Sequence, residues 1–204
     1  MVLDKLKNIT NYIRKNKLLQ IQLIVIIFCL IIGTLLHFTY NWSGENQFIA
    51  TISSVNESVW EHLKLVFYPM LFAGIMEYFF VKDITNNYLE AKTIGIFGAI
   101  SFIVIVYFTY TGILGTNLFL IDILTFIASI VIGEWISYKL MKRENESTNT
   151  SKILATVILV FLTLSFIICT FCPPRVNLFK SPNNGMYGVD IAKNKRILYN
   201  NHKS

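Results

Sequence analysis

Residues Leu19 to Tyr40 read LQIQLIVIIFCLIIGTLLHFTY, a run that contains no Lys, Arg, Asp or Glu. A helix that spans a bilayer needs about 20 consecutive, mostly apolar residues, and this run has that length. A basic leader precedes it, as in a secretory signal peptide. The end of the run, Thr-Leu-Leu-His-Phe-Thr-Tyr, lacks small residues at the spacing of a cleavage site, so we predict a retained membrane span.

Four further segments have the length and composition of membrane spans, and they are 63–81, 93–112, 118–141 and 153–172. Charged residues make up only 15% of the chain, against about 25% in an average soluble domain. No internal repeat is evident, so an inverted-repeat transporter is not supported. The sequence therefore predicts an all-α fold, a polytopic transmembrane helical bundle of about five spans with a short turn-rich C-terminal tail.

Lys and Arg beside the spans predict how the chain crosses the membrane. They occur in the leader, between the second and third spans and between the fourth and fifth, whereas 41–61 and 113–117 contain none. Cytoplasmic loops are enriched in these residues, so we predict a cell-membrane protein with a cytoplasmic N-terminus. Arg175 and Lys180 oppose an outside tail, because they follow the last span closely. The predicted parts are a basic cytoplasmic leader (1–18), a five-helix transmembrane domain (19–172) and an extracytoplasmic tail (173–204).

The formal net charge of +6 would suggest nucleic acid in a soluble protein. Here the basic residues lie mostly beside apolar blocks, where topology and anionic lipid account for them. We therefore predict the lipid bilayer as the partner, and no nucleic acid.

The most informative polar stretch opens the second span and reads Ser53-Ser54-Val55-Asn56-Glu57-Ser58-Val59-Trp60-Glu61-His62-Leu63-Lys64. Ser54 and Glu57 have the spacing of a capping box, in which each side chain bonds the other residue's backbone N–H. Glu57, Glu61 and Lys64 recur at helical spacing and share one predicted helix face. His62 points about 100° away from Glu61. The stretch indicates either a capped helix start or the wall of an outward-facing pocket.

Asp122 lies near the outer end of the fourth predicted span. The small and polar residues that follow it at helical spacing are Thr125, Ser129, Gly133 and Ser137. Such a stripe indicates close helix packing, whereas an intramembrane acid usually faces protein or a cavity. His37 and Tyr110 fall at the same predicted depth as Asp122. We predict that a pocket at this depth binds a ligand through Glu57, Glu61, His62, Lys64, Asp122 and Tyr110.

Glu77 and Glu134 form a separate pair of acids in the inner halves of their spans. One interpretation is ion pairing at the interface, with Lys82 beside Glu77 and Lys139 beside Glu134. The other is a proton relay or ion site, since intramembrane acids are costly and often functional.

Metal binding and hydrolysis are weaker hypotheses. His62 with Glu57, Glu61 or Asp122 has suitable metal-ligand types, but the spacing matches no helical metal motif such as H-E-x-x-H. Ser58 lies four residues before His62, yet no G-x-S-x-G motif is present. We therefore assign no metal ligand and no catalytic residue, and the cofactor stays open.

The motif Asn56-Glu57-Ser58-x-Trp60-Glu61-His62-x-Lys64 resembles the signature of a bacterial membrane-protein family known as domain of unknown function 6512. Further similarities are Tyr110-Thr111-Gly112-Ile113-Leu114-Gly115, Asp122, and a tail with Pro173-Pro174, Leu178-Phe179, Pro182, Gly185 and Tyr187-Gly188. The tail departs from the pattern at Ser181, where an acid is expected, and at 175–177. The resemblance implies an uncharacterised multi-pass membrane protein. It implies no particular activity, because the family has none assigned.

Three functions fit these residues. The first is an outward-facing pocket for a small polar ligand or a lipid headgroup, in a transporter-like or accessory protein. The second is a membrane-embedded enzyme, such as a metal-assisted hydrolase, with Glu61 or Asp122 as general base and His62 as base or metal ligand. The third is purely structural, with the polar groups capping helices and pairing with one another.

Overall fold

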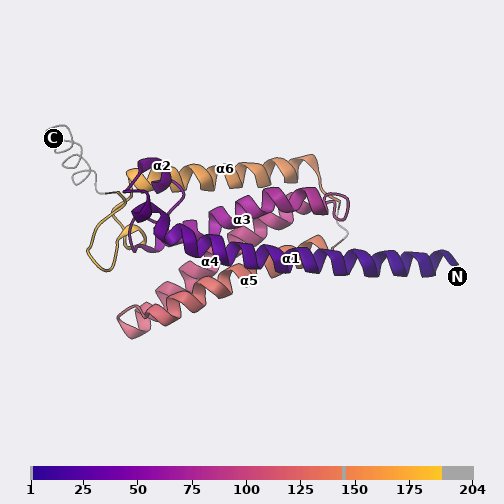
Figure 1. Ribbon diagram of the computed structural model, residues 1–204, viewed down its shortest axis with the longest axis horizontal. Helices are drawn as coiled ribbons and strands as arrows, with labels where there is room; N and C mark the ends of the chain where they lie inside the picture. Colours follow the sequence, from indigo (N-terminus) through magenta and orange to yellow (C-terminus); the bar gives the residue numbers. More distant parts are fainter. Residues whose placement is uncertain (1, 144–145, 190–204) are drawn as a thin grey trace.

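The computed structural model describes residues 2–143 and 146–189, with the backbone alone for 2–16. Figure 1 shows its elements in chain order: α1 (Val2–Trp42), α2 (Gln47–Ala50), α3 (Val59–Val81), α4 (Tyr88–Leu114), α5 (Phe119–Met141), α6 (Asn149–Phe171) and the 3-10 helix η1 (Asn177–Phe179). Five helices are long and apolar enough to cross a membrane, counting α1 from Lys17. The described part contains no β-strand. The predicted all-helical bundle with five spans is confirmed.

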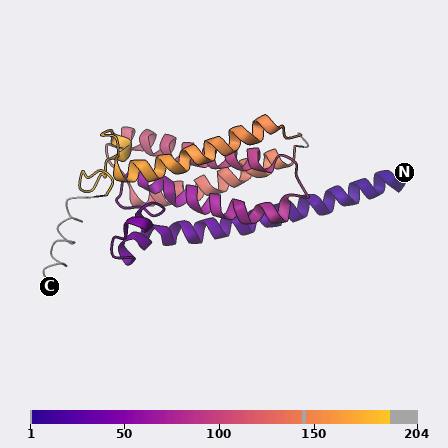
Figure 2. The same ribbon diagram turned by 90° about the horizontal axis from the view of Figure 1, so that it is seen from above.

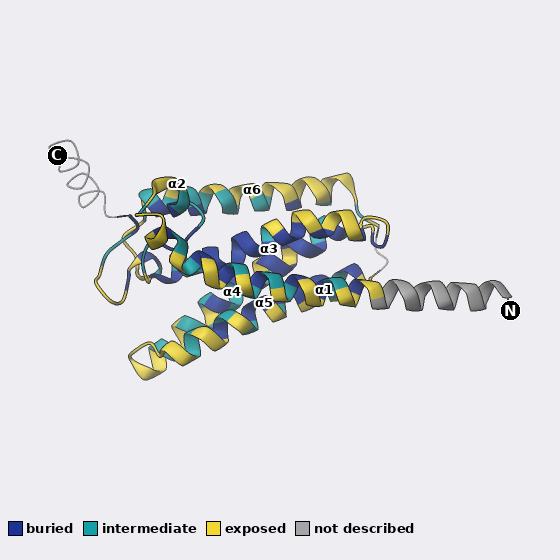
Figure 3. Ribbon diagram, viewed as in Figure 1, coloured by how far each residue is buried: buried dark blue, intermediate teal, exposed yellow. Residues whose placement is uncertain are grey.

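Helix α3 is the central helix of the bundle. It contacts α1, α4, α5, α6 and η1, and α4 and α5 form the most extensive helix pair. Figure 2 shows α1 running beside α3. Figure 3 shows that α3 is mostly buried, whereas α6 presents an exposed apolar surface, as a helix facing lipid does. We call the end that holds Trp42 and the segment after α6 the tail end, and the opposite end the leader end.

Small residues allow α4 and α5 to pack closely. A Cβ atom added at Gly95 would overlap Ser137 Oγ and would lie 2.5 Å from the Gly133 carbonyl oxygen. Ala99 on α4 meets Gly133 on α5 in the same way, one turn further along. Backbones approach this closely only where side chains are small. The packing that was predicted for the stripe Thr125, Ser129, Gly133 and Ser137 is therefore present at Gly133 and Ser137.

Helices α1 and α3 also pack through a glycine. A Cβ atom at Gly33 would overlap the Leu65 carbonyl oxygen. Pro69 has no N–H, so this carbonyl lacks its usual intrahelical donor four residues later. Gly33 of α1 therefore lies against the turn of α3 in which the Leu65 carbonyl lacks its usual intrahelical hydrogen bond.

The start of α3 differs from the prediction. Ser58 is the N-cap residue, and its hydroxyl accepts from Glu61 N at 3.4 Å. The predicted capping box is therefore wrong, and Ser54 Oγ lies 3.3 Å from His37 Nδ1 instead. Glu57 precedes the helix, so it does not share a helix face with Glu61 and Lys64.

The segment after α6 folds back on the tail end. Val189 N donates to the Thr170 carbonyl oxygen at 2.9 Å, and an isolated antiparallel bridge joins Lys180 and Tyr187. Gly188 has a φ of 55°, and a Cβ there would overlap that same carbonyl oxygen. The turn-rich tail is confirmed up to Val189, and 190–204 lies outside the described residues. The leader, membrane-domain and tail boundaries stay a prediction.

We predict that Gly95→Ala destabilises the bundle more than Gly98→Ala does. The Gly95 variant pushes a methyl group against the α5 backbone, whereas a Cβ at Gly98 meets only the terminal Ile136 Cδ1 atom, 2.9 Å away. Overpacking of this kind costs about 1–3 kcal/mol. Thermal unfolding in detergent micelles measures both variants, and equal melting temperatures would contradict the close α4–α5 approach.

Candidate functional site

A cavity of about 660 Å³ lies at the tail end of the bundle. Its wall comes from α1, α3, α4, α5, the loop before α3, and Pro182 and Asn183 of the tail. The polar side chains His37, His62 and Asp122 line its part nearest the tail end. One turn deeper along these helices the lining is Gly33, Leu65 and Phe126. The cavity is therefore polar toward the tail end and mostly apolar further in.

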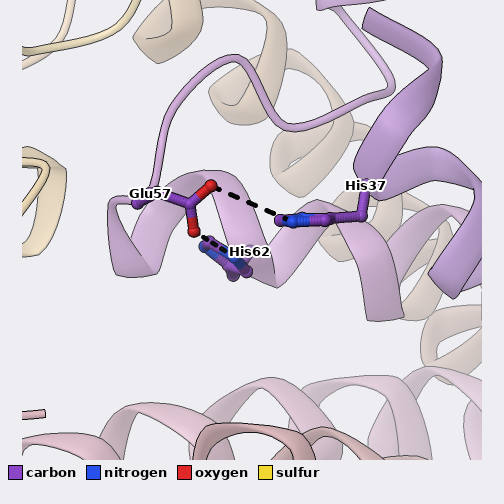
Figure 4. A group of neighbouring side chains, drawn as sticks. All are labelled: His37, Glu57 and His62. Carbon is purple, nitrogen blue, oxygen red and sulfur yellow. Dashed lines mark ion pairs between the residues drawn. The ribbon is translucent and has the colours of Figure 1, made fainter. Parts of the chain in front are cut away.

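Three side chains converge at the polar part of this cavity. His37 comes from α1, His62 from the first turn of α3, and Glu57 from the loop between them (Figure 4). Glu57 Oε2 lies 3.3 Å from His62 Nε2, and Glu57 Oε1 lies 3.9 Å from His37 Nε2. One ligand atom from each residue lies within 4.8 Å of the others. All three residues are partly accessible, so the cluster faces the cavity rather than the protein core.

Hydrogen bonds orient the two imidazole rings. His62 Nδ1 lies 2.9 Å from the Ser58 carbonyl oxygen, and a carbonyl only accepts, so Nδ1 carries a hydrogen. When His62 is an imidazolium, Nε2–H donates to Glu57. This hydrogen bond lowers the pKa of the Glu57 carboxyl below its usual value, although partial burial opposes the shift. Glu57 is therefore a carboxylate at neutral pH.

Asp122 forms a second polar group on the same cavity. The Tyr110 hydroxyl donates to Asp122 Oδ1, and Asn117 Nδ2 lies 3.4 Å from Oδ2. Asp122 lines the cavity itself, whereas Tyr110 holds Asp122 in place. The structure thus brings Glu57, His62 and Asp122 to one cavity.

Glu61 and Lys64 do not line this cavity and form a buried network of hydrogen bonds of their own. Lys64 is fully buried, and its Nζ lies 2.5 Å from Glu61 Oε2. Lys64 also donates to the Ala50 carbonyl oxygen at 2.8 Å and to Thr170 Oγ1 at 3.0 Å. Val55 N donates to Glu61 Oε2 at 3.1 Å. These two residues do not line the cavity, but they hold the loop that carries Glu57.

The loop is also held from the tail. Asn56 Nδ2 donates to the Gly188 carbonyl oxygen at 3.0 Å, and Asn56 Oδ1 accepts from Ser58 N at 2.8 Å. Asn56 and Val55, the two residues directly before Glu57, are therefore both bonded to fixed partners. The position of Glu57 depends on α3, α6 and the tail together.

A second buried polar cluster lies toward the leader end. Lys92 Nζ contacts Glu77 Oε2 at 2.7 Å and both Glu134 oxygens at 2.8 and 2.7 Å. Gln22 of α1 donates to Glu77 Oε1, and the Tyr88 hydroxyl lies 3.1 Å from Glu77 Oε2. The cluster joins α1, α3, α4 and α5. The two predicted acids meet, and their partner is Lys92 rather than Lys82 or Lys139.

A cavity of about 720 Å³ opens beside this cluster. Lys92 lines it together with Lys82, Glu90 and Lys152, and Glu90 accepts from Ser151 Oγ at 2.6 Å. All three Lys92 N–H groups are taken by the two carboxylates. Lys92 therefore has no N–H group left for a ligand. Its ion pairs instead hold α3, α4 and α5 together.

Sequence reasoning missed His37 and Lys92 as members of these clusters. His37 was placed at the correct depth, but nothing along the chain shows that α1 lies against the start of α3. Lys92 was counted as a loop charge, although α4 begins at Tyr88, one turn earlier. With a helix start at Tyr88, the spacing of Tyr88, Lys92 and Gly95 places Lys92 on the helix face that packs against α5. This spacing is the sequence signal that could have identified Lys92 as a buried residue.

The fold and the two buried polar clusters are those of a multi-pass helical membrane protein, with a cavity at the tail end. The family described as "Family of unknown function (DUF6512)" matches residues 9–189, and the chain belongs to this family. No curated protein and no solved structure matches the chain.

We predict that Lys92→Met destabilises the protein strongly, because it leaves two carboxylates buried without a counter-charge. Breaking such a buried pair costs about 3–5 kcal/mol. Lys82→Met at the exposed leader end is the matched control. Unfolding in detergent micelles, followed by circular dichroism, compares the two variants. A Lys92 variant as stable as the Lys82 variant would contradict the stabilising role of the Lys92 ion pairs.

Proposed function

We propose that this protein binds an amphipathic molecule in the tail-end cavity. The polar headgroup would lie at Glu57, His37, His62 and Asp122, and the apolar part along Leu65, Ile103 and Phe126. The observation that carries this proposal is the polarity gradient of the cavity, from charged groups near the surface to an apolar floor. Ligand sites combine an apolar wall with a few polar groups that set orientation.

The shape of the site favours a lipid-like ligand over a fully polar one. Ile123 lines the cavity and is 38% exposed, so the cavity is open at this residue of an apolar, membrane-length helix. A lipid could therefore enter sideways from the bilayer. A fully polar solute would leave the apolar floor without a partner.

The direction of the chain in the membrane belongs to the same proposal. The tail end, with Glu57 and Asp122, would face the outside, and the leader end would face the cytoplasm. Lys82, Lys142, Arg143 and Lys152 lie at the leader end and support this orientation, whereas Arg175 and Lys180 lie at the tail end and count against it.

We predict that Ile123→Trp reduces the amount of lipid that co-purifies with the protein, because the indole fills the cavity. Ile127→Trp is the control, since Ile127 lies one turn away on α5, is 39% exposed and does not line the cavity. Native mass spectrometry after purification in a mild detergent measures bound lipid per chain. Equal lipid retention by both variants would count against a cavity ligand.

We predict that Cys172 is labelled by a membrane-impermeant maleimide in intact cells. Cys172 is exposed at the tail end, whereas Cys29 is buried in the bundle. Cys172→Ser should lose most of the label. In that background, Asp83→Cys at the exposed leader end should react only after lysis. The opposite pattern would reverse the proposed orientation.

A further inference from the structure

We propose that His37, Glu57 and His62 form a binding site for a divalent transition-metal ion such as Zn²⁺. The inference rests on the proposed function in one respect only, since the ion's role would be to hold the ligand headgroup in the cavity. The binding of the ion itself stands on the geometry of these three side chains.

The distances fit a single ion. Zn²⁺ binds His nitrogen and carboxylate oxygen at about 2.0–2.2 Å, so two ligand atoms at a tetrahedral angle lie about 3.4 Å apart. Glu57 Oε2 lies 3.3 Å from His62 Nε2, and Glu57 Oε1 lies 3.9 Å from His37 Nε2. All three ligand atoms fit within 4.8 Å of one another. Ligand atoms of one ion lie about 3.4 Å apart, so rotation of the side chains has to bring the most distant pair closer than this 4.8 Å limit.

The orientation of the rings also fits. In neutral His62 the hydrogen is on Nδ1, which donates to the Ser58 carbonyl oxygen, so Nε2 presents its lone pair to Glu57. His37 Nδ1 meets Ser54 Oγ at 3.3 Å, and its Nε2 also faces Glu57. Metal-bound histidines typically bond their second nitrogen in this way, which fixes the ring and the tautomer.

The pair His62 and Glu57 needs either a proton on His62 or a cation between the two groups. A carboxylate oxygen and a neutral imidazole nitrogen are both acceptors, and they repel each other at 3.3 Å. A proton on His62 would satisfy the His62–Glu57 pair only. It would leave His37 Nε2 at 3.9 Å from Glu57, with the two rings 5.2 Å apart. One divalent cation would bind all three groups.

The donor set indicates the class of metal and its use. Imidazole nitrogen favours zinc and its neighbours over calcium or magnesium, which prefer oxygen. Three protein ligands leave a fourth position open, as in catalytic rather than structural zinc sites. Here that position faces the cavity. With Glu57 the ion would leave one net positive charge, which suits a phosphate or carboxylate oxygen of the headgroup.

The first test is metal content. Full-length protein is purified in detergent, stripped with a chelator and dialysed against Zn²⁺, and bound metal is measured by mass spectrometry. We expect about one Zn²⁺ per chain, and an affinity at least about tenfold lower in His37→Ala, Glu57→Gln and His62→Ala. Zn²⁺ should also raise the melting temperature of the wild type but not of these variants, because a ligand bound only by the folded state stabilises it.

Two controls exclude other zinc ligands. His202→Ala removes the third histidine, and the double variant Cys169→Ser/Cys172→Ser removes the C-x-x-C pair. Both should bind Zn²⁺ as the wild type does. The inference is overturned if wild-type protein binds no Zn²⁺, or if Glu57→Gln and His62→Ala bind it with wild-type affinity while remaining folded.

A second test separates the ion from the cavity ligand. Ile123→Trp should keep Zn²⁺ and lose lipid, because it changes the cavity wall and none of the three ligands. Short-chain phosphatidylglycerol should bind the zinc-loaded protein more tightly than the chelator-treated protein, and glycerol phosphate without acyl chains should bind weakly to both. Zinc binding without lipid retention would overturn only the proposed function. Lipid retention without zinc would overturn only this inference.

Discussion

The buried ion pair between Glu61 and Lys64 is the interaction on which the tail end of the protein depends. An ammonium inside a membrane bundle must find all its acceptors within the protein, because lipid offers none. Lys64 finds them on three elements: Glu61 beside it on α3, the Ala50 carbonyl of α2 and Thr170 of α6. Glu61 in turn binds the backbone of Val55, two residues before Glu57. The position of Glu57 between two histidines therefore follows from charges that do not face the cavity.

At the leader end a buried lysine likewise finds its acceptors within the protein. Lys92 is enclosed by Glu77 and Glu134, and Gln22 and Tyr88 supply further donors to Glu77. Between the two polar clusters, helices α4 and α5 meet at glycine, serine and alanine, so their backbones come close. A buried polar cluster at each end and close helix packing between them therefore hold the helices of the bundle together.

The sequence predicted the helices well because hydrocarbon imposes length and composition on any span. It predicted the depth of Glu57, His62 and Asp122 for the same reason. It could not separate Glu57 from Glu61, since their spacing of four residues fits one helix face equally well. The helix in fact begins after Glu57, because Ser58 rather than Ser54 caps it. That single turn directs Glu57 toward His62 and leaves Glu61 with Lys64.

By itself the sequence determined five apolar helices, a turn-rich tail and an excess of polar groups near one end, since each follows from local composition and period. Only the tertiary structure decided which of these groups meet. His37 joins Glu57 and His62 because α1 packs on α3 at Gly33, and Lys92 joins Glu77 and Glu134 because α4 packs between α3 and α5. Contacts between distant segments depend on how helix faces fit together, and the spacing of residues along one chain shows which face is small or polar but not which helix it meets.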